Sequence, residues 1–250
     1  MTHQTLASCL RRGLLAGLLG GLLAGFFALV IGEKPLEQAI RLEAVAASSG
    51  VANTQAPADP EGDGTGVVVS RRTQRLGLLA ATGVVGVALG GLFGAVFAMV
   101  GGGVTTDGPW LASVKLGVAA WLAVAVLPSL KYPANPPGVG DPATVGSRSV
   151  WYLTAILLSV VTALAVWGLN GRLKHVGVSV AQRHLLAGAA AVAGVVLVAA
   201  LPANSDPIRI PADLLWNFRL NAFATTATLW FTLVVVFGLL GVRGAHRGAR

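Results

Sequence analysis

Charged side chains are scarce in this sequence of 250 residues. Only 11% of the residues are Asp, Glu, Lys or Arg, whereas 54% are hydrophobic. A soluble globular protein has about a quarter of its residues charged, because its surface must be solvated by water. The shortage excludes a soluble globule and a nucleic-acid-binding domain, although the formal net charge is +8. It indicates a chain whose surface faces the lipid bilayer.

Cysteine and catalytic motifs are nearly absent as well. The one cysteine, Cys9, excludes an intramolecular disulfide framework and any CxxC metal or redox site. No GxxxxGK[ST] phosphate loop is found, so nucleotide hydrolysis by this chain is not expected. Within the apolar runs no acid and base pair up at helical spacing, and Lys115 is the one ionisable residue in mid-run. The sequence therefore predicts a protein that is not an enzyme.

Six long apolar runs are present, and each can cross about 30 Å of hydrocarbon as a helix of about 20 residues. We predict an all-α fold, a polytopic integral membrane helical bundle forming a single membrane domain over residues 1–250. Five spans are the alternative, because Lys115 lies inside the third run, although a lysine near a helix end can extend to the interface. The predicted transmembrane helices are residues 13–31, 76–100, 110–130, 150–169, 184–201 and 221–240.

The one long loop is expected between the first two runs, at residues 32–75. It opens with EKPLEQAIRLEAVAA, which is typical of a helix lying at the membrane interface. It continues through APADPEGDGTG, which is typical of a disordered segment. The first run could instead be a signal peptide, but GEKPLEQ follows it rather than a small-residue cleavage site, which favours an uncleaved helix.

Glycine is abundant, with 33 residues, and much of it recurs at every fourth position in the first two runs. Small residues at this spacing allow two membrane helices to approach closely. Close packing is therefore expected around these two runs. The repeating glycines are Gly13, Gly17, Gly21 and Gly25 in the first run and Gly86, Gly90 and Gly94 in the second.

The basic residues favour a cytoplasmic N-terminus by the positive-inside rule. Arg71, Arg72 and Arg75 oppose this orientation, because they adjoin the second run on the expected outer side. With the N-terminus inside, all carboxylates except Asp107 collect on the outer side and all four histidines on the inner side. Such an order would draw a divalent cation toward the outer face, although polar residues gather in loops for solubility alone.

Two proline-rich segments stand out, LPSLKYPANPPGVGDPATVGSRSVWY from Leu127 and LPANSDPIRIPADLLWNFRL from Leu201. Proline cannot continue a helix, so the first segment must end the third run in a rigid, extended turn. It would present Tyr132, Asn135 and Asp141 in fixed positions. The alternative interpretation is a stiff connector between helices.

These two segments, together with RRGLLAGLLGGLLAG from Arg11 and GEKPLEQAIRLE from Gly32, resemble the CbtA family of predicted cobalt transporter subunits. The YPANPPGVGDP stretch is the most specific part. The resemblance implies uptake of cobalt for cobalamin synthesis, with a small single-span, histidine-rich partner subunit of the CbtB type. The family is usually described with five spans, whereas six are expected here.

We therefore expect a multi-pass subunit in the cell membrane that takes up a divalent metal, with Co²⁺ as its cargo and no bound cofactor. Its partners would be the lipid bilayer and the CbtB-like subunit, with no nucleic acid. A scaffold that transports nothing and positions partner proteins is the alternative. The expected metal ligands are Glu33, Glu37, Glu43 and Asp141, and the expected entrance residues are Tyr132 and Asn135.

Overall fold

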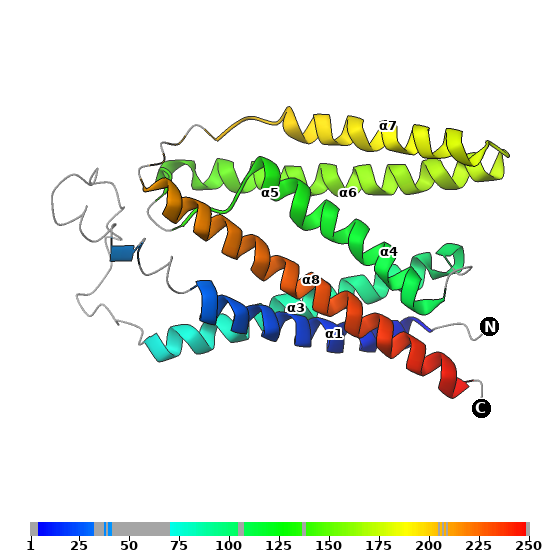
Figure 1. Ribbon diagram of the computed structural model, residues 1–250, viewed down its shortest axis with the longest axis horizontal. Helices are drawn as coiled ribbons and strands as arrows, with labels where there is room; N and C mark the ends of the chain where they lie inside the picture. Colours follow the sequence, from blue (N-terminus) through cyan, green and yellow to red (C-terminus); the bar gives the residue numbers. More distant parts are fainter. Residues whose placement is uncertain are drawn as a thin grey trace. The chain divides into compact units, whose positions relative to one another are not determined.

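In the computed structural model, every regular element of the described residues is helical. Six of the helices are long and apolar enough to cross a membrane (Figure 1), which confirms the all-α fold class. They are Leu6–Gly32, Thr73–Val100, Pro109–Lys131, Val145–His175, Val180–Ala199 and Ala212–Gly244. The structure describes residues 5–32, 38, 40–41, 71–104, 108–136, 139–204, 206, 208 and 210–248. Most of the predicted interfacial helix and disordered segment lies outside these residues.

The elements follow one another as a series of helices joined by turns. The first half contains α1 (Leu6–Phe27), the π-helical η1 (Ala28–Gly32), α3 (Arg71–Val104) and α4 (Pro109–Trp121). The π-helical η2 (Leu122–Val126) and α5 (Leu127–Lys131) complete the third span. The second half contains η3 (Pro142–Thr144), α6 (Val145–His175), α7 (Val180–Ala199) and α8 (Ala212–Gly248).

The chain divides into two compact units, a division that the sequence pattern did not indicate. Unit 1 comprises Met1–Gly117, Pro136–Gly138 and Ile210–Arg250. Unit 2 comprises Val118–Asn135 and Val139–Arg209. Unit 1 therefore contains α1, α3, the start of α4 and α8, whereas unit 2 contains α5, α6 and α7.

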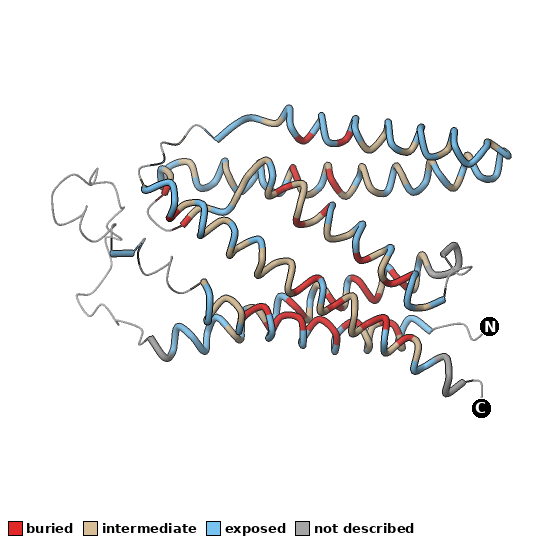
Figure 2. Tube along the Cα trace, in the orientation of Figure 1, coloured by how far each residue is buried: buried red, intermediate tan, exposed pale blue. Residues whose placement is uncertain are grey.

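Glycines bring α1 and α3 of unit 1 into backbone contact. A Cβ atom at Gly17 would overlap the carbonyl oxygen of Gly86, and one at Gly13 would overlap that of Gly90. These positions require glycine because any larger side chain would push the two backbones apart. Buried residues gather along α1 and the facing part of α3 in Figure 2. The close packing expected of the first two spans is confirmed.

An aromatic cluster lies where α3 and α8 meet in unit 1. The ring of Phe237 stands edge-on to those of Phe93 and Phe97, with centroids 5.0 and 4.9 Å away. Arg12 of α1 places its guanidinium carbon 4.8 Å from the centroid of the Phe237 ring. A cation over an aromatic face is attracted by the ring quadrupole, and more strongly where water is excluded. Arg12 is therefore stabilised near the start of the first span.

Proline shapes the end of the third span in unit 2. The ring of Pro128 cannot fit against the carbonyl group four residues earlier in a regular α-helix, and proline lacks an N–H donor. The chain widens into the π-helix η2 just before it, and the Leu127 N–H bonds to the Leu122 carbonyl five residues back. The span nevertheless remains helical from Pro109 to Lys131, including Lys115.

In unit 2, α6 and α7 form a hairpin with largely exposed apolar faces. The turn passes through Gly177, whose φ is +80°. Ser179 is the N-cap of α7, and its hydroxyl accepts a hydrogen bond from the backbone N–H of Gln182. Leu153 is 63% exposed and Leu185 is 74% exposed. Figure 2 shows that most of both helices is exposed. Such surfaces are unfavourable in water and favourable against lipid tails.

Candidate functional site

The two proline-rich segments meet in unit 2, where the turn between α5 and α6 contacts the chain that follows α7. Asp206 is at the centre of this contact, and its side chain is 7% exposed. Its Oδ2 atom accepts hydrogen bonds from the Thr144 hydroxyl at 2.8 Å and the Asp141 amide at 3.3 Å. Arg148 Nε lies 3.4 Å from the same oxygen as an ion pair. We call Gly140, Asp141, Thr144, Arg148 and Asp206 the Asp206 cluster.

Asp141 organises the start of α6 within this cluster. Its carboxylate accepts a hydrogen bond from the Ala143 amide at 2.8 Å, and its carbonyl group accepts one from the Thr144 hydroxyl at 2.8 Å. Arg148 Nη2 also donates to that carbonyl group, at 3.2 Å. A carboxylate that bonds the amide two residues on forms an Asx turn, which fixes the chain before a helix. Asp141 is nonetheless exposed to its surroundings.

Gly140 is required by the backbone of the cluster. Its φ of +101° is in the left-handed region, and a Cβ atom there would collide with the Arg148 guanidinium and approach Asp206 Oδ2 to 3.0 Å. Both the conformation and the space therefore exclude a side chain. Any larger residue would separate Arg148 from Asp206 or strain the turn.

Gly140→Ala is expected to destabilise the protein by about 1–3 kcal/mol, since it adds both backbone strain and a steric clash. Gly146→Ala is the matched control, because Gly146 lies in α6 with no atom near its missing Cβ and alanine favours a helix. The measurement is the thermal unfolding midpoint of the purified variants in the same detergent. Equal midpoints for the two variants would contradict the role of Gly140.

Tyr132 and Lys131 join the first proline-rich segment to the end of α7. The Tyr132 hydroxyl donates to the Pro202 carbonyl group at 2.7 Å, and Lys131 Nζ donates to the Ala199 carbonyl group at 2.8 Å. A cation at the last carbonyl groups of a helix is favoured by the helix dipole. Desolvation raises the pKa of Tyr132 above its ordinary value, which agrees with a protonated phenol that donates this hydrogen bond. Asn135, three residues on, is half-buried.

The structure brings two of the predicted site residues to one pair of loops. Tyr132 and Asp141 both bond to the segment that follows α7, and Asn135 lies between them in the sequence. Glu33, Glu37 and Glu43 lie outside the described residues. Among the described residues, no group of three or more His, Cys, Asp or Glu side chains could hold a metal ion.

The sequence interpretation did not identify Thr144, Arg148 and Asp206 as partners. Arg148 belongs to the first proline-rich segment and Asp206 to the second. The contact between Thr144 and Asp206 could not be predicted from local sequence patterns, because the two residues are 62 positions apart.

The oxygen atoms of the Asp206 cluster could bind a cation only weakly. Its contacts use Oδ1 of Asp141 and Oδ2 of Asp206, so one oxygen of each carboxylate has no hydrogen bond within the described part of the chain. Arg148 offsets one of the two negative charges. Two carboxylate oxygens beside a guanidinium do not form a closed site, which for a divalent cation needs about six oxygen ligands. The arrangement suits transient contact with a cation rather than permanent binding.

Comparison with known proteins identifies the family. A family model described as a probable cobalt transporter subunit, CbtA, matches residues 6–241. The chain belongs to the CbtA family. This match includes the Asp206 cluster and at least part of each of the six long apolar helices in the described residues. It confirms the resemblance that the proline-rich segments indicated. No curated protein and no solved structure matched the chain. This CbtA-family protein is therefore a multi-pass membrane protein and a probable cobalt transporter subunit.

Proposed function

We propose that this CbtA-family protein is the membrane-embedded subunit through which Co²⁺ crosses the cell membrane to supply cobalamin synthesis. The observation that supports this proposal most directly is the family match over residues 6–241. The six long apolar helices provide the membrane-spanning body that such a subunit needs. Co²⁺ is the cargo, and the chain needs no resident cofactor and catalyses no reaction.

In this proposal, four of the carboxylates expected on the outer side collect the ion. Glu33, Glu37, Glu43 and Asp141 supply the negative charge, and Tyr132 and Asn135 line the entrance. Carboxylate oxygens attract a hydrated divalent cation, and sparse ligands let it leave again, as transport requires.

The rigidity of the entrance has a physical basis in unit 2. Asp206 holds the turn before α6, and Tyr132 and Lys131 hold the end of the third span against the chain after α7. Prolines on both segments further limit their freedom. An entrance of fixed shape presents its oxygen atoms without an entropic cost of ordering loops when the ion arrives.

A small single-span subunit with a histidine-rich segment, of the CbtB type, is the proposed partner. This chain has four histidines, His3, His175, His184 and His246, and they are spread over its length. Imidazole is a good ligand for transition metals, so a partner rich in histidine would concentrate the metal that this chain conducts.

Asp141→Asn and Glu37→Gln are expected to lower the initial rate of cobalt uptake by about tenfold at low salt, because the lost charges attract the ion to the entrance. Asparagine keeps an oxygen that can accept the Ala143 hydrogen bond, so the first variant removes charge without removing the turn. The measurement is uptake of radioactive cobalt by cells that express equal amounts of each variant.

Asp213→Asn is the matched control for uptake, since Asp213 is an exposed carboxylate in the first turn of α8 and has no proposed role at the entrance. Its uptake should equal that of the unmodified protein. Unchanged uptake by both Asp141→Asn and Glu37→Gln would remove these residues from the proposed pathway.

The alternative is a scaffold that positions partner subunits and moves no ion. The exposed apolar faces of α6 and α7 favour it, because such faces can bind other membrane helices as well as lipid. Reconstitution into liposomes with the partner subunit distinguishes the two functions. Cobalt entry that requires this chain supports transport, whereas no entry under a driving ion gradient supports the scaffold.

A further inference from the structure

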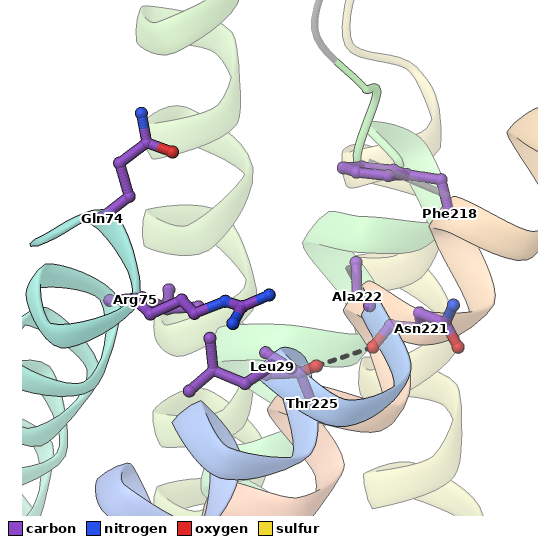
Figure 3. A pocket seen from close by; sticks show the side chains of 10 residues that line it. Leu29, Gln74, Arg75, Phe218, Asn221, Ala222 and Thr225 are labelled. Carbon is purple, nitrogen blue, oxygen red and sulfur yellow. Dashed lines mark hydrogen bonds between the residues drawn. The ribbon is translucent and has the colours of Figure 1, made fainter. Parts of the chain in front are cut away.

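Unit 1 contains a pocket of about 360 Å³ that the proposed cobalt pathway does not use. Three elements of the unit form its walls, namely η1, the start of α3 and α8. Its apolar walls include Ala28, Leu29, Leu78, Phe218 and Ala222, and Arg75 lies among them (Figure 3). A pocket of this size is large enough to receive part of an organic ligand.

The pocket lies where one long apolar helix ends and the next begins. Gly32 is the last residue of the first membrane-crossing helix, and Gln74 is the second residue of the next. Both residues line the pocket. The ends of membrane-spanning helices lie near the border between hydrocarbon and headgroups, so we expect lipid tails and charged headgroups to reach this pocket.

Arg75 supplies the charge within the pocket. Figure 3 shows its side chain extending from α3 toward Ala222 of α8, whereas the amide of Asn221 points away. The Thr225 hydroxyl donates to the Asn221 carbonyl group at 2.8 Å, so its proton is already used. Arg75 also interacts within the chain, and its guanidinium has five N–H donors, so contacts within the chain and with a ligand are compatible.

A basic side chain among apolar walls favours binding of an anionic amphiphile over binding of a metal cation. Arg75 would repel a divalent cation, and no described carboxylate lines the pocket. A guanidinium matches the geometry of a phosphate group and forms strong, charge-assisted hydrogen bonds with it. Leu29, Leu78 and Phe218 offer the apolar contact that an acyl chain needs.

We propose that the pocket binds an anionic phospholipid, with its phosphate at Arg75 and an acyl chain against the apolar walls. Such binding gives a reason for Arg75 at the start of α3, where the positive-inside rule does not predict a basic residue if the N-terminus is cytoplasmic. Basic side chains at the edge of a span attract anionic headgroups from either leaflet. The inference does not depend on cobalt transport.

The test is binding of spin-labelled phosphatidylglycerol and phosphatidylcholine to the full chain in nanodiscs made of phosphatidylcholine. We expect preferential binding of phosphatidylglycerol, reduced about tenfold in Arg75→Gln because a charge-assisted phosphate contact is lost. Arg75→Lys should retain part of the preference. Arg172→Gln, in the last turn of α6, is the matched control and should bind as the unmodified protein does.

Two further measurements separate the possible occupants. Ala222→Phe would fill the pocket while leaving Arg75 in place, and it should also reduce the preference for phosphatidylglycerol. Inorganic phosphate should not compete with the lipid at matched concentration, since it lacks the acyl chain. Equal binding by Arg75→Gln, by Ala222→Phe and by the unmodified protein would overturn the proposal, as would full competition by inorganic phosphate.

Discussion

Gly90→Ala is expected to destabilise the protein by about 3 kcal/mol or more and to reduce sharply the amount of folded protein recovered from membranes. A Cβ atom at Gly90 would collide with the Gly13 carbonyl group and lie 2.8 Å from the Gly17 Cα atom. Both neighbours are backbone atoms of α1, which cannot rotate away as a side chain can. The collision can therefore be avoided only if α1 and α3 move apart. This movement weakens the packing along the whole α1–α3 interface.

The matched control is Gly77→Ala, in the same helix, where a Cβ atom meets nothing within 4 Å. This change should leave stability unchanged or raise it slightly, since alanine favours a helix. The measurement is the thermal unfolding midpoint in detergent together with the yield after size-exclusion chromatography. A midpoint for Gly90→Ala within error of that for Gly77→Ala would show that the α1–α3 contact is looser than the structure indicates.

Asp206→Ala is expected to lower the free energy of unfolding by about 2–3 kcal/mol and to reduce cobalt uptake. The change leaves the Arg148 guanidinium, the Thr144 hydroxyl and the Asp141 amide without their shared acceptor. Removing one partner of a buried pair costs about 3–5 kcal/mol. The expected value is smaller because 28% of the Arg148 side chain is exposed and water can reach it.

A double-mutant cycle isolates this contact. If Arg148 and Asp206 stabilise each other, Arg148→Gln with Asp206→Ala should cost less than the sum of the two single changes. Asp213→Ala is the control, since it removes an exposed carboxylate at the start of α8 and should cost at most about 1 kcal/mol. Additive losses would mean that the pair contributes no coupling. Loss of stability without loss of uptake would separate the Asp206 cluster from the proposed entrance.

The membrane fold could be predicted because lipid imposes a simple rule on sequence. A chain in hydrocarbon must satisfy its backbone hydrogen bonds internally, so each long apolar run becomes a helix. Lys115 made the third span the least certain, yet the helix continues through it from Pro109 to Lys131. Because a lysine near a helix end can extend its charge to the interface, a single charge there does not interrupt a span.

Helix ends were less predictable than helix centres. α3 begins at Arg71, within the stretch expected to be a loop, and α6 runs from Val145 to His175, beyond the predicted 150–169. Apolar content marks where lipid surrounds a helix, but a helix can extend past the lipid with polar residues on its surface. Likewise, α8 starts at Ala212, before the predicted 221–240, at a point where a proline and an acidic residue favour a helix start.

The candidate site was predictable only in part. The prolines showed that Tyr132 and Asp141 lie in stiff segments, since the effect of proline on the backbone is local. The acceptors of their hydrogen bonds could not be inferred, because Pro202 and Asp206 lie 70 and 65 positions away in the sequence. Arg148 and Asp206 are residue types that are common in loops, and their positions in the sequence did not indicate that they form an ion pair.

The sequence by itself determined that this CbtA-family chain crosses the membrane repeatedly and that its first two spans pack closely. Both follow from local patterns, namely the long apolar runs and the glycines at every fourth position. Tertiary structure decided the rest. It joined the proline-rich segments through Asp206, divided the chain into two units and formed the pocket at Arg75. Each of these features depends on side chains that are far apart in the chain and meet only after the helices have packed.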